Sequence, residues 1–358
     1  MPLDLTPLNN AKRLLFKIPL IPLQGSRFQP TGFPSLGAAT FQTGNGGSLL
    51  VESAQSMANH LEMTIWDNAK NDVKEAFKDL SHVRITRNGK FLTDTILESH
   101  RVNSPYLLTS SDRTFLDAFL KTLRQELGKD TVDKNEGLVD RQGLARAILR
   151  FDCGSLIHGC FLSNNKVKLS EQATKGVALA GGRLRVARAL SAFIEADDVH
   201  VAPSGGVKND HVNPSGVSED GFGNIPFARD EYTAASITLY VNLDLAQIRG
   251  YGLENAAERL LILLSLYKLR ALTTEGMRLR TACDLCVERE EIEATIPRGW
   301  CLPALDDLEE AVKTAIAACK EADKMVVTCA TFEDELKKGK VADVTPVEDA
   351  GEAVEEDT

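Results

Sequence analysis

The sequence contains no run of apolar residues long enough to cross a membrane. Its most apolar stretch, Leu260 to Leu266, is far shorter than the roughly 20 residues that a transmembrane helix needs. Residues Met1 to Asp4 lack the basic and apolar regions of a secretion signal. The seven cysteines are an odd number without regular spacing, which is more typical of reduced thiols than of a disulfide framework. We therefore expect a cytoplasmic protein with no membrane partner.

The sequence also lacks the complete signatures of common metal and catalytic sites. Cys283 and Cys286 have the spacing of two zinc ligands, but no second pair of ligands lies at the usual distance, so we expect no metal. The run Gly44 to Gly47 lacks the Gly-Lys-Ser/Thr ending of a phosphate-binding loop. His158 and His200 are accompanied by no nucleophile elbow or HExxH pattern, and lone histidines are usually structural. We expect no cofactor and no catalytic residue.

The net charge of -10 is distributed unevenly along the chain. Residues 341–358 carry seven acidic and no basic side chains, and we expect the acidic tail over 331–358 to be disordered. Residues 82–191, in contrast, contain 18 Lys and Arg against 11 Asp and Glu. This excess is compatible with a phosphate-binding surface and equally with a solvated face of mixed charge. Three arginines at its end are the candidates for such a surface: Arg183, Arg185 and Arg188.

The periodicity of apolar residues predicts a mixture of strands and helices. Strands are predicted at Leu14–Ile21, Ala147–Phe151, Leu156–Leu162, Tyr232–Leu243 and Met325–Val327. Helices are predicted at Leu49–Ile65, Arg113–Leu127 and Leu253–Leu272, and another after a capping box of Asp306 and Glu309. Because these elements do not alternate strictly, we expect an α+β fold over residues 1–330, with helices on one face of an antiparallel sheet and large insertions.

One irregular stretch, Pro203 to Tyr232, is unusually long for a connection inside a folded domain. It mixes aromatic residues, which can stack on bases, with donors for phosphates and bases. The candidates are Lys208, Asn209, His211, Asn213, Phe222, Asn224, Phe227 and Arg229. Its Gly-Phe-Gly sequence is not the aromatic motif of an ordinary RNA-recognition strand, because Pro226 cannot donate to a central ladder. A protruding RNA-binding hairpin fits this composition.

Four blocks of the sequence resemble the backbone subunit of the type I-G (formerly I-U) CRISPR Cascade complex. They are Gly25–Pro34, Leu50–Asn59, Ala189–Glu195 and Gly205–Pro214, and the likeness extends from about Lys17 to Leu272. The resemblance implies the RAMP version of the ferredoxin-like, RRM-like fold, with a palm and a thumb hairpin over about 203–231. It also implies a non-catalytic protein that polymerises along a guide RNA (crRNA) and leaves bases free to pair with target DNA. The other partners would be further copies of the chain, a large subunit and a guide-processing, end-capping subunit.

The resemblance also implies particular RNA-binding residues. Ser53, Gln55, Ser56 and Asn59 match the helix that such proteins place against guide phosphates, although the Lys or Arg residues often found after it are missing here. Arg27 and Gln29 lie in the first matching block.

Two alternative functions remain open from the sequence. One is a metal-dependent ribonuclease of the same fold family that uses Asp210 and His211 on guide precursor or target RNA. The other is an RNA-binding module that acts as a single copy.

Overall fold

The structure is a computed structural model that describes residues 3–33, 37–44, 46–128, 140–162, 184–208 and 225–335. The last 23 positions of the predicted tail, 336–358, lie outside these residues. Residues 331–335 do not belong to a separate tail, because they contact the folded chain. Phe332 N donates to Thr86 O, and the carboxylate of Asp334 accepts a hydrogen bond from Ser111 N. Among the described residues, no helix is both long and apolar enough to cross a lipid bilayer.

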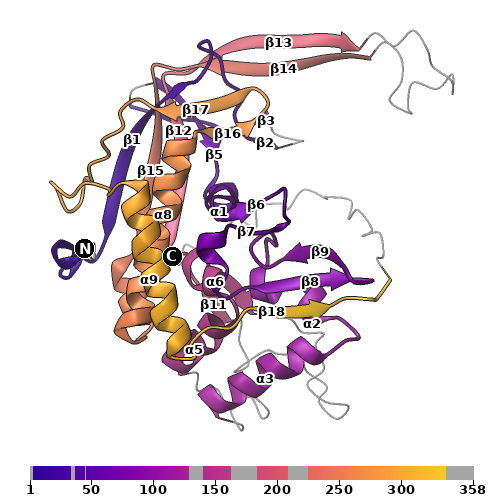
Figure 1. Cartoon of the computed structure of the whole chain (residues 1–358). Coiled ribbons are helices and arrows are strands. Elements are labelled where there is room, and N and C mark those ends of the chain that lie inside the picture. The colour runs from indigo at the N-terminus through magenta and orange to yellow at the C-terminus, as the bar shows by residue number, and fades with distance from the viewer. Residues whose placement is uncertain are drawn as a thin grey trace, which may run out of the picture.

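The centre of the fold is a seven-stranded antiparallel sheet (Figure 1). In spatial order its strands are β16 (Met277–Arg280), β17 (Cys283–Val287), β1 (Leu14–Pro22), β15 (Ser236–Leu243), β12 (Leu190–Asp197), β5 (Gly46–Glu52) and β4 (Thr40–Thr43). Burial alternates along β1 and β12, so one face of the sheet is apolar and buried. Leu14, Phe16, Ile18 and Leu20 of β1 point into this face, whereas Lys17 is exposed.

The connections between the central strands define a ferredoxin-like fold. The chain runs from β1 through α1 (Ala54–Met63) to β12 and β15, and then through α8 (Asn255–Glu275) to β17. Their spatial order, β17-β1-β15-β12, places the first strand between the last and the third. This is the β-α-β-β-α-β arrangement of ferredoxin-like domains. The predicted α+β, ferredoxin-like fold with large insertions is therefore confirmed.

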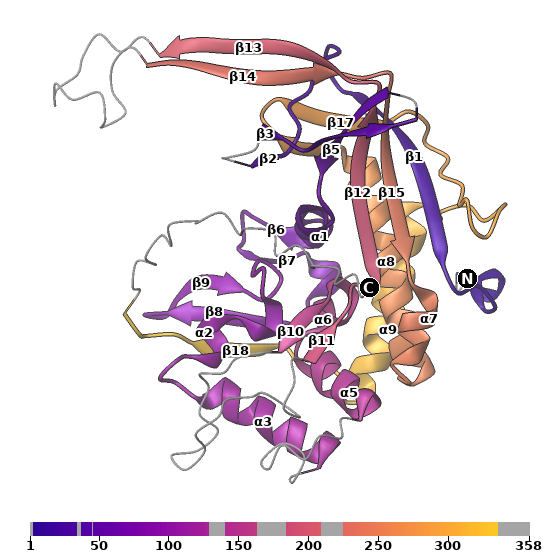
Figure 2. The same ribbon diagram turned by 180° about the vertical axis from the view of Figure 1, so that it is seen from behind.

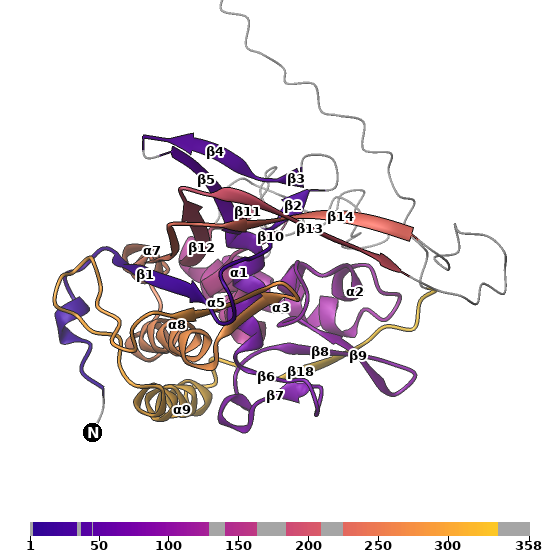
Figure 3. The same ribbon diagram turned by 90° about the horizontal axis from the view of Figure 1, so that it is seen from above.

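Helices cover the buried face of the sheet. Helix α8 packs between the sheet and α9 (Leu305–Glu321), as the view from above shows (Figure 3). It is buried around most of its circumference, because α1 and α6 (Cys153–His158) also contact it. The short helix α7 (Leu245–Gly250) follows β15 and also packs on α8.

A large insertion between α1 and β12 forms a second lobe beside the sheet (Figure 2). A three-stranded sheet in this lobe contains β8 (Val83–Arg87), β9 (Lys90–Asp94) and β18 (Thr328–Thr331). Its other elements are β6 (Trp66–Asp67), β7 (Asp72–Val73), α2 (Pro105–Leu108), α3 (Thr114–Leu127), α5 (Arg141–Phe151), α6, β10 (Cys160–Leu162) and β11 (Leu184–Val186). Both ends of the insertion join the lobe to the central sheet. A third connection runs through α9, because β18 follows this helix in the chain and pairs with β8 of the lobe.

A second insertion, between β12 and β15, forms a hairpin that projects from the sheet (Figure 1). Its strands, β13 (His200–Lys208) and β14 (Ile225–Thr233), pair antiparallel from His200↔Thr233 to Lys208↔Ile225. Two backbone hydrogen bonds between Phe28 and Tyr232 attach its base to the segment that follows β1. The hairpin predicted near 203–231 is therefore present, and it begins three residues earlier. A small ladder of β2 (Gly32–Phe33) and β3 (Gly37–Ala38) lies between β1 and β4 in the sequence.

Two predicted strands and two predicted helix starts differ from the structure. The segments Ala147–Phe151 and Leu156–His158 are helical rather than extended, because Asp140 and Asp152 cap helices α5 and α6 through their carboxylates. Residues 49–52 belong to strand β5, where Leu49 and Val51 are buried, so the predicted helix begins only after Ser53. Helix α9 has Ala304 at its N-cap with no side-chain cap, and Asp306 lies inside its first turn.

Other predicted boundaries moved by a few residues. Helix α8 begins and ends slightly later than predicted, and the last strand lies at Thr328–Thr331 rather than at Met325–Val327. The predicted strand Tyr232–Leu243 is divided, since β14 ends at Thr233 and β15 starts at Ser236.

Candidate nucleic-acid interface

The base of the hairpin brings three predicted RNA-binding residues together around one buried carboxylate. Glu231 is 6% exposed, and its oxygens lie 3.5 Å from Arg27 Nη1 and 3.3 Å from Arg229 Nη2. Arg229 Nη1 also donates to Gln29 Oε1 over 3.4 Å. Two guanidinium groups therefore share a single negative charge, and the Arg27 side chain is 55% exposed. Arg27 remains able to contact an anion from solvent.

A second ion pair lies next to this base, at the start of helix α1. Arg280 pairs with the buried carboxylate of Glu52, and it also donates to the carbonyl oxygens of Gln29 and Val51. These bonds connect β5, the end of β16 and the segment after β1. They hold the N-terminal end of α1 beside the hairpin.

Helix α1 exposes a neutral polar face. Gln55 and Asn59, one turn apart, are exposed, and Ser56 is half-buried. The Ser53 hydroxyl is the N-cap of the helix and accepts from Ser56 N at 3.3 Å, so its main role here is structural. Within the glycine run 44–47, Gly46 and Gly47 begin strand β5 and pair with β4, so they do not lie at the helix start.

At the other end of α1 the structure forms a groove of about 520 Å³ between the second lobe and the start of β12. Arg185 and Arg188, both exposed, line it together with two side chains that the sequence did not single out, His100 and Arg101. The described residues that line the groove include no Asp or Glu. A groove lined by cations and neutral groups favours an anionic ligand.

Phe161 forms part of one wall of this groove. Strands β10 and β11 pair so that Phe161 lies directly opposite Arg185. The Arg185 guanidinium lies over the ring, 5.7 Å from its centroid, and the ring is 37% exposed. No sequence pattern connects these residues, because they are far apart along the chain.

A buried charged network supports the floor of the groove. Arg101 donates to Glu62 through both Nε and Nη2, over 3.1 and 2.7 Å, and both residues are almost fully buried. Beside them, Lys268 Nζ lies 3.0 Å from Nε2 of the buried His158. Burial, reinforced by the charges of Lys268 and Arg101, lowers the pKa of His158 well below its usual value, so its imidazole is neutral. His158 is thus a neutral residue of the floor.

The hairpin base, the α1 face and the groove follow one another along a single helix. Glu52, beside the N-terminal end of α1, binds Arg280, and Glu62 in its last turn binds Arg101. A helix of this length spans about 15 Å. Gln55 and Asn59 lie between the two arginine clusters. The exposed cations and amides form a track that suits an extended polyanion.

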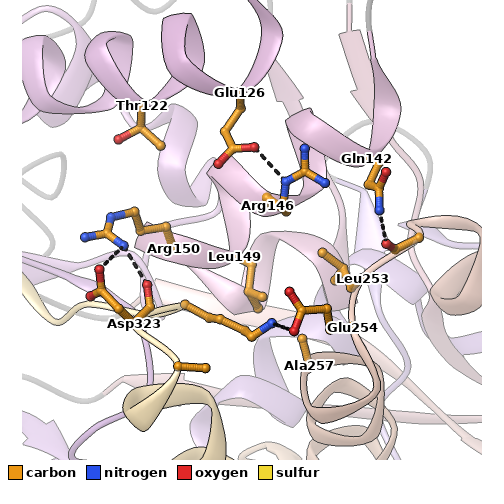
Figure 4. Close-up of a pocket in the computed structure, with 13 residues that line it drawn as sticks. Thr122, Glu126, Gln142, Arg146, Leu149, Arg150, Leu253, Glu254, Ala257 and Asp323 are labelled. Carbon is orange, nitrogen blue, oxygen red and sulfur yellow. Dashed lines mark hydrogen bonds and ion pairs between the residues drawn. The ribbon is translucent and has the colours of Figure 1, made fainter.

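The enclosed pocket at the junction of α3, α5, α8 and α9 is less suited to a ligand (Figure 4). Its charged side chains face one another: Glu126 accepts from Arg146 over 2.6 Å, Arg150 donates to Asp323 O over 2.7 Å, and Lys324 pairs with Glu254. Because these charges are satisfied within the protein, the pocket is a structural junction.

The two cysteines with zinc-like spacing lie within strand β17. Residues three apart along a strand point to opposite faces, so Cys283 and Cys286 do not face one common ion. Burial raises the pKa of Cys283 to about 11, which keeps it a thiol at neutral pH. Among the residues that the structure describes, no cluster of three or more His, Cys, Asp or Glu side chains could hold a metal ion.

Several predicted site residues are not placed. Arg183, Asn209, His211, Asn213, Phe222 and Asn224 lie outside the described residues, as does Asp210 of the alternative ribonuclease site. Lys208 and Phe227 lie in the two strands of the hairpin.

A family model described as CRISPR-associated protein GSU0053 matches residues 14–201, more than half of the chain. The chain belongs to this CRISPR-associated family. The match begins with β1 and ends in β13, and so includes the first half of the ferredoxin-like core and the second lobe. It confirms the predicted relationship to the backbone subunits of CRISPR effector complexes. The type I-G assignment stays a prediction.

Two solved structures of CRISPR-associated proteins are also similar to the chain. Csc2 from Thermofilum pendens is 11% identical, with 86% of this chain and 77% of Csc2 covered and a TM-score of 0.31. A chain of a CRISPR RNA-guided surveillance complex is also 11% identical, with 77% and 73% covered and a TM-score of 0.37. TM-scores this low add no evidence for the fold assignment, which rests on the strand order. No curated protein matches the sequence.

Proposed function

We propose that this member of the family is the non-catalytic backbone subunit that binds guide RNA in a CRISPR surveillance complex of type I-G. Several copies line up along one guide, and sequence is read by pairing of guide bases with target DNA. The other partners are a large subunit and a guide-processing, end-capping subunit, and the complex acts in the cytoplasm. The observation that carries the proposal is the track along α1, between a projecting hairpin and a cationic groove.

The track offers the contacts that binding of an RNA sugar-phosphate backbone requires. Arg27, Arg185 and Arg188 provide exposed charge at its two ends, and Gln55 and Asn59 provide neutral donors between them. Contacts of this kind bind phosphates without reading bases. A subunit of a guide-bearing filament needs this property, because it must bind any guide sequence.

The direct test is to express the chain together with a CRISPR array and to measure whether RNA co-purifies. We expect a bound RNA and, in negative-stain images, elongated assemblies. Isolated particles that carry RNA would instead support the single-copy module.

The ribonuclease alternative is tested on the same preparation. The purified chain is incubated with labelled RNA and Mg²⁺, next to an Asp210→Ala variant. We expect no cleavage by either protein. Cleavage by the natural chain that Asp210→Ala abolishes would contradict the non-catalytic assignment.

A further inference from the structure

The groove at the C-terminal end of α1 has structural features that positive charge alone does not account for. Its volume of about 520 Å³ lies within the range of small-molecule sites. It combines a stacking surface, exposed cations and a buried polar floor in one place. Each of these features matches a different part of a nucleotide.

The stacking surface consists of Phe161 and Arg185. Their position is fixed by the β10–β11 ladder, because the two residues are direct cross-strand partners. Nucleobases stack on aromatic rings and on guanidinium planes alike, and this preference does not depend on the base. Phe161 is one of the few large apolar side chains on the described surface that is more than a third exposed, and burial of this ring by a base would remove apolar area from water.

The phosphate side of the groove consists of Arg188 and His100, and His158 lies in its floor. Nε2 of the neutral His158 lies 3.0 Å from Lys268 Nζ, so this ring nitrogen is already paired within the protein. Its Nδ1 is buried and has no hydrogen-bond partner, and the residue is only 1% exposed. Buried polar atoms are normally satisfied, so this unpartnered nitrogen in the lining of a cationic groove is available to a polar group of a ligand.

The carboxylates beneath the groove are paired or hydrogen-bonded within the protein. The negative charge of Glu62 is matched by Arg101, and Asp152 accepts hydrogen bonds from Val102 N, Gly154 N and the Ser155 hydroxyl. Charged and donor groups that remain on the groove surface are therefore cationic or neutral.

We propose that this groove is a subsite for one nucleotide of single-stranded RNA, with its base on the Phe161–Arg185 surface and its phosphate against Arg188, His100 and His158. The inference rests on the proposed function and makes it more specific. It assigns base stacking to the second lobe, away from the hairpin. At each copy, one nucleotide is held there without regard to its identity.

The test uses the full chain and a short single-stranded RNA of adenosines that contains 2-aminopurine, whose fluorescence reports stacking. Affinity is measured over a series of salt concentrations for the natural chain, for Phe161→Leu, and for a double Arg185→Gln and Arg188→Gln variant. Arg298→Gln is the matched control, because this exposed arginine lies between β17 and α9 and does not line the groove. Thermal melting checks that each variant is folded.

We expect Phe161→Leu to lower the affinity at least about fivefold and to remove quenching of 2-aminopurine, with no change in the salt slope. The double arginine variant should reduce the slope of log K against log salt by about 0.7, since Arg188 makes one phosphate contact and each such contact contributes about 0.7 for single strands. Arg298→Gln should leave both quantities unchanged. If the natural chain binds RNA and the groove variants behave like the control, the subsite is wrong and the proposed function stands. If the natural chain does not bind RNA, both are wrong.

Discussion

At the scale of single residues, buried ionisable groups hold the second lobe and the groove together. Asp94, on strand β9, is buried, and its Oδ2 has no hydrogen-bond partner. Burial raises the pKa of Asp94 to about 8, and it lowers the pKa of the neighbouring His82 to about 4. Both side chains are therefore neutral at pH 7, although their nearest atoms are 4.0 Å apart.

The raised pKa of Asp94 makes a prediction about pH. The folded chain keeps a proton on Asp94 that the unfolded chain releases above pH 4, so the stabilisation by this group is lost as pH rises from about 4 to about 8. Asp94→Asn mimics the protonated acid at every pH. We expect the free energy of unfolding of the natural chain to fall relative to Asp94→Asn by up to about 1.4 kcal/mol per pH unit over this interval. Denaturant unfolding at pH 5 and pH 8 measures this difference.

An exposed acid gives the control for that comparison. Asp307 lies in the first turn of α9 and is exposed. The difference between the natural chain and Asp307→Asn should stay nearly constant between pH 5 and pH 8. An equally constant difference for Asp94→Asn would show that Asp94 is already ionised in the folded chain.

The Glu62–Arg101 pair under the groove makes a second prediction. Glu62→Gln leaves a buried guanidinium without its counter-charge, which costs roughly 3–5 kcal/mol in buried pairs. A double variant, Glu62→Leu with Arg101→Met, should regain most of this loss because both members of the buried pair are removed together. Urea unfolding measures both. A loss below about 1 kcal/mol for Glu62→Gln would mean that water reaches Arg101.

Some residues owe their role to contacts with residues far away in the chain, and these could not be predicted from the sequence. Phe161 meets Arg185 only because β10 and β11 pair, and Arg101 reaches α1 only because the second lobe folds back on it. Local signals were more informative. Gln55 and Asn59, which helical spacing places on one polar side, are exposed together.

At the scale of elements, strands and helices with a clear apolar period were predicted well. The helices that begin at an aspartate cap and lack such a period were not. The alternation along β1 and the apolar stripe of α8 gave nearly correct boundaries. The strand predicted at 147–151 and the first part of the one predicted at 156–162 are helical, because Asp140 and Asp152 cap helices there and a run of apolar residues buried on all sides has no period. The end of the second prediction is correct, since Cys160–Leu162 is strand β10.

The hairpin β13–β14 is the element that the proposed assembly depends on. Pro203 and Asp230 are direct partners in its ladder, so residues 204–229 can be replaced by Asn-Gly as a two-residue turn. We expect the shortened chain to melt near the temperature of the natural chain, since the two strands pair only with each other in their sheet. It should no longer form elongated assemblies on RNA.

Thermal melting measures whether the shortened chain is folded, and negative-stain imaging of the co-expressed complex shows whether elongated assemblies form. Elongated assemblies from a folded, shortened chain would show that copies associate through another surface.

At the scale of the whole molecule, the ferredoxin-like strand order places the two insertions on which the proposed function depends at the two ends of one strand. The second lobe comes from the connection between α1 and β12, and the hairpin comes from the connection between β12 and β15. Both therefore start from the ends of one strand, β12, with α1 beside it. This placement explains how the hairpin base and the groove come to lie at opposite ends of the same helix.

The central claim is that the chain carries a guide RNA, and sequencing the RNA that co-purifies with it tests this most directly. The chain is expressed with a CRISPR array, purified under native conditions, and its bound RNA is extracted and sequenced. The account predicts RNA of uniform length that contains repeat and spacer sequences from the array. Bound RNA drawn at random from cellular transcripts, or no RNA, would contradict it.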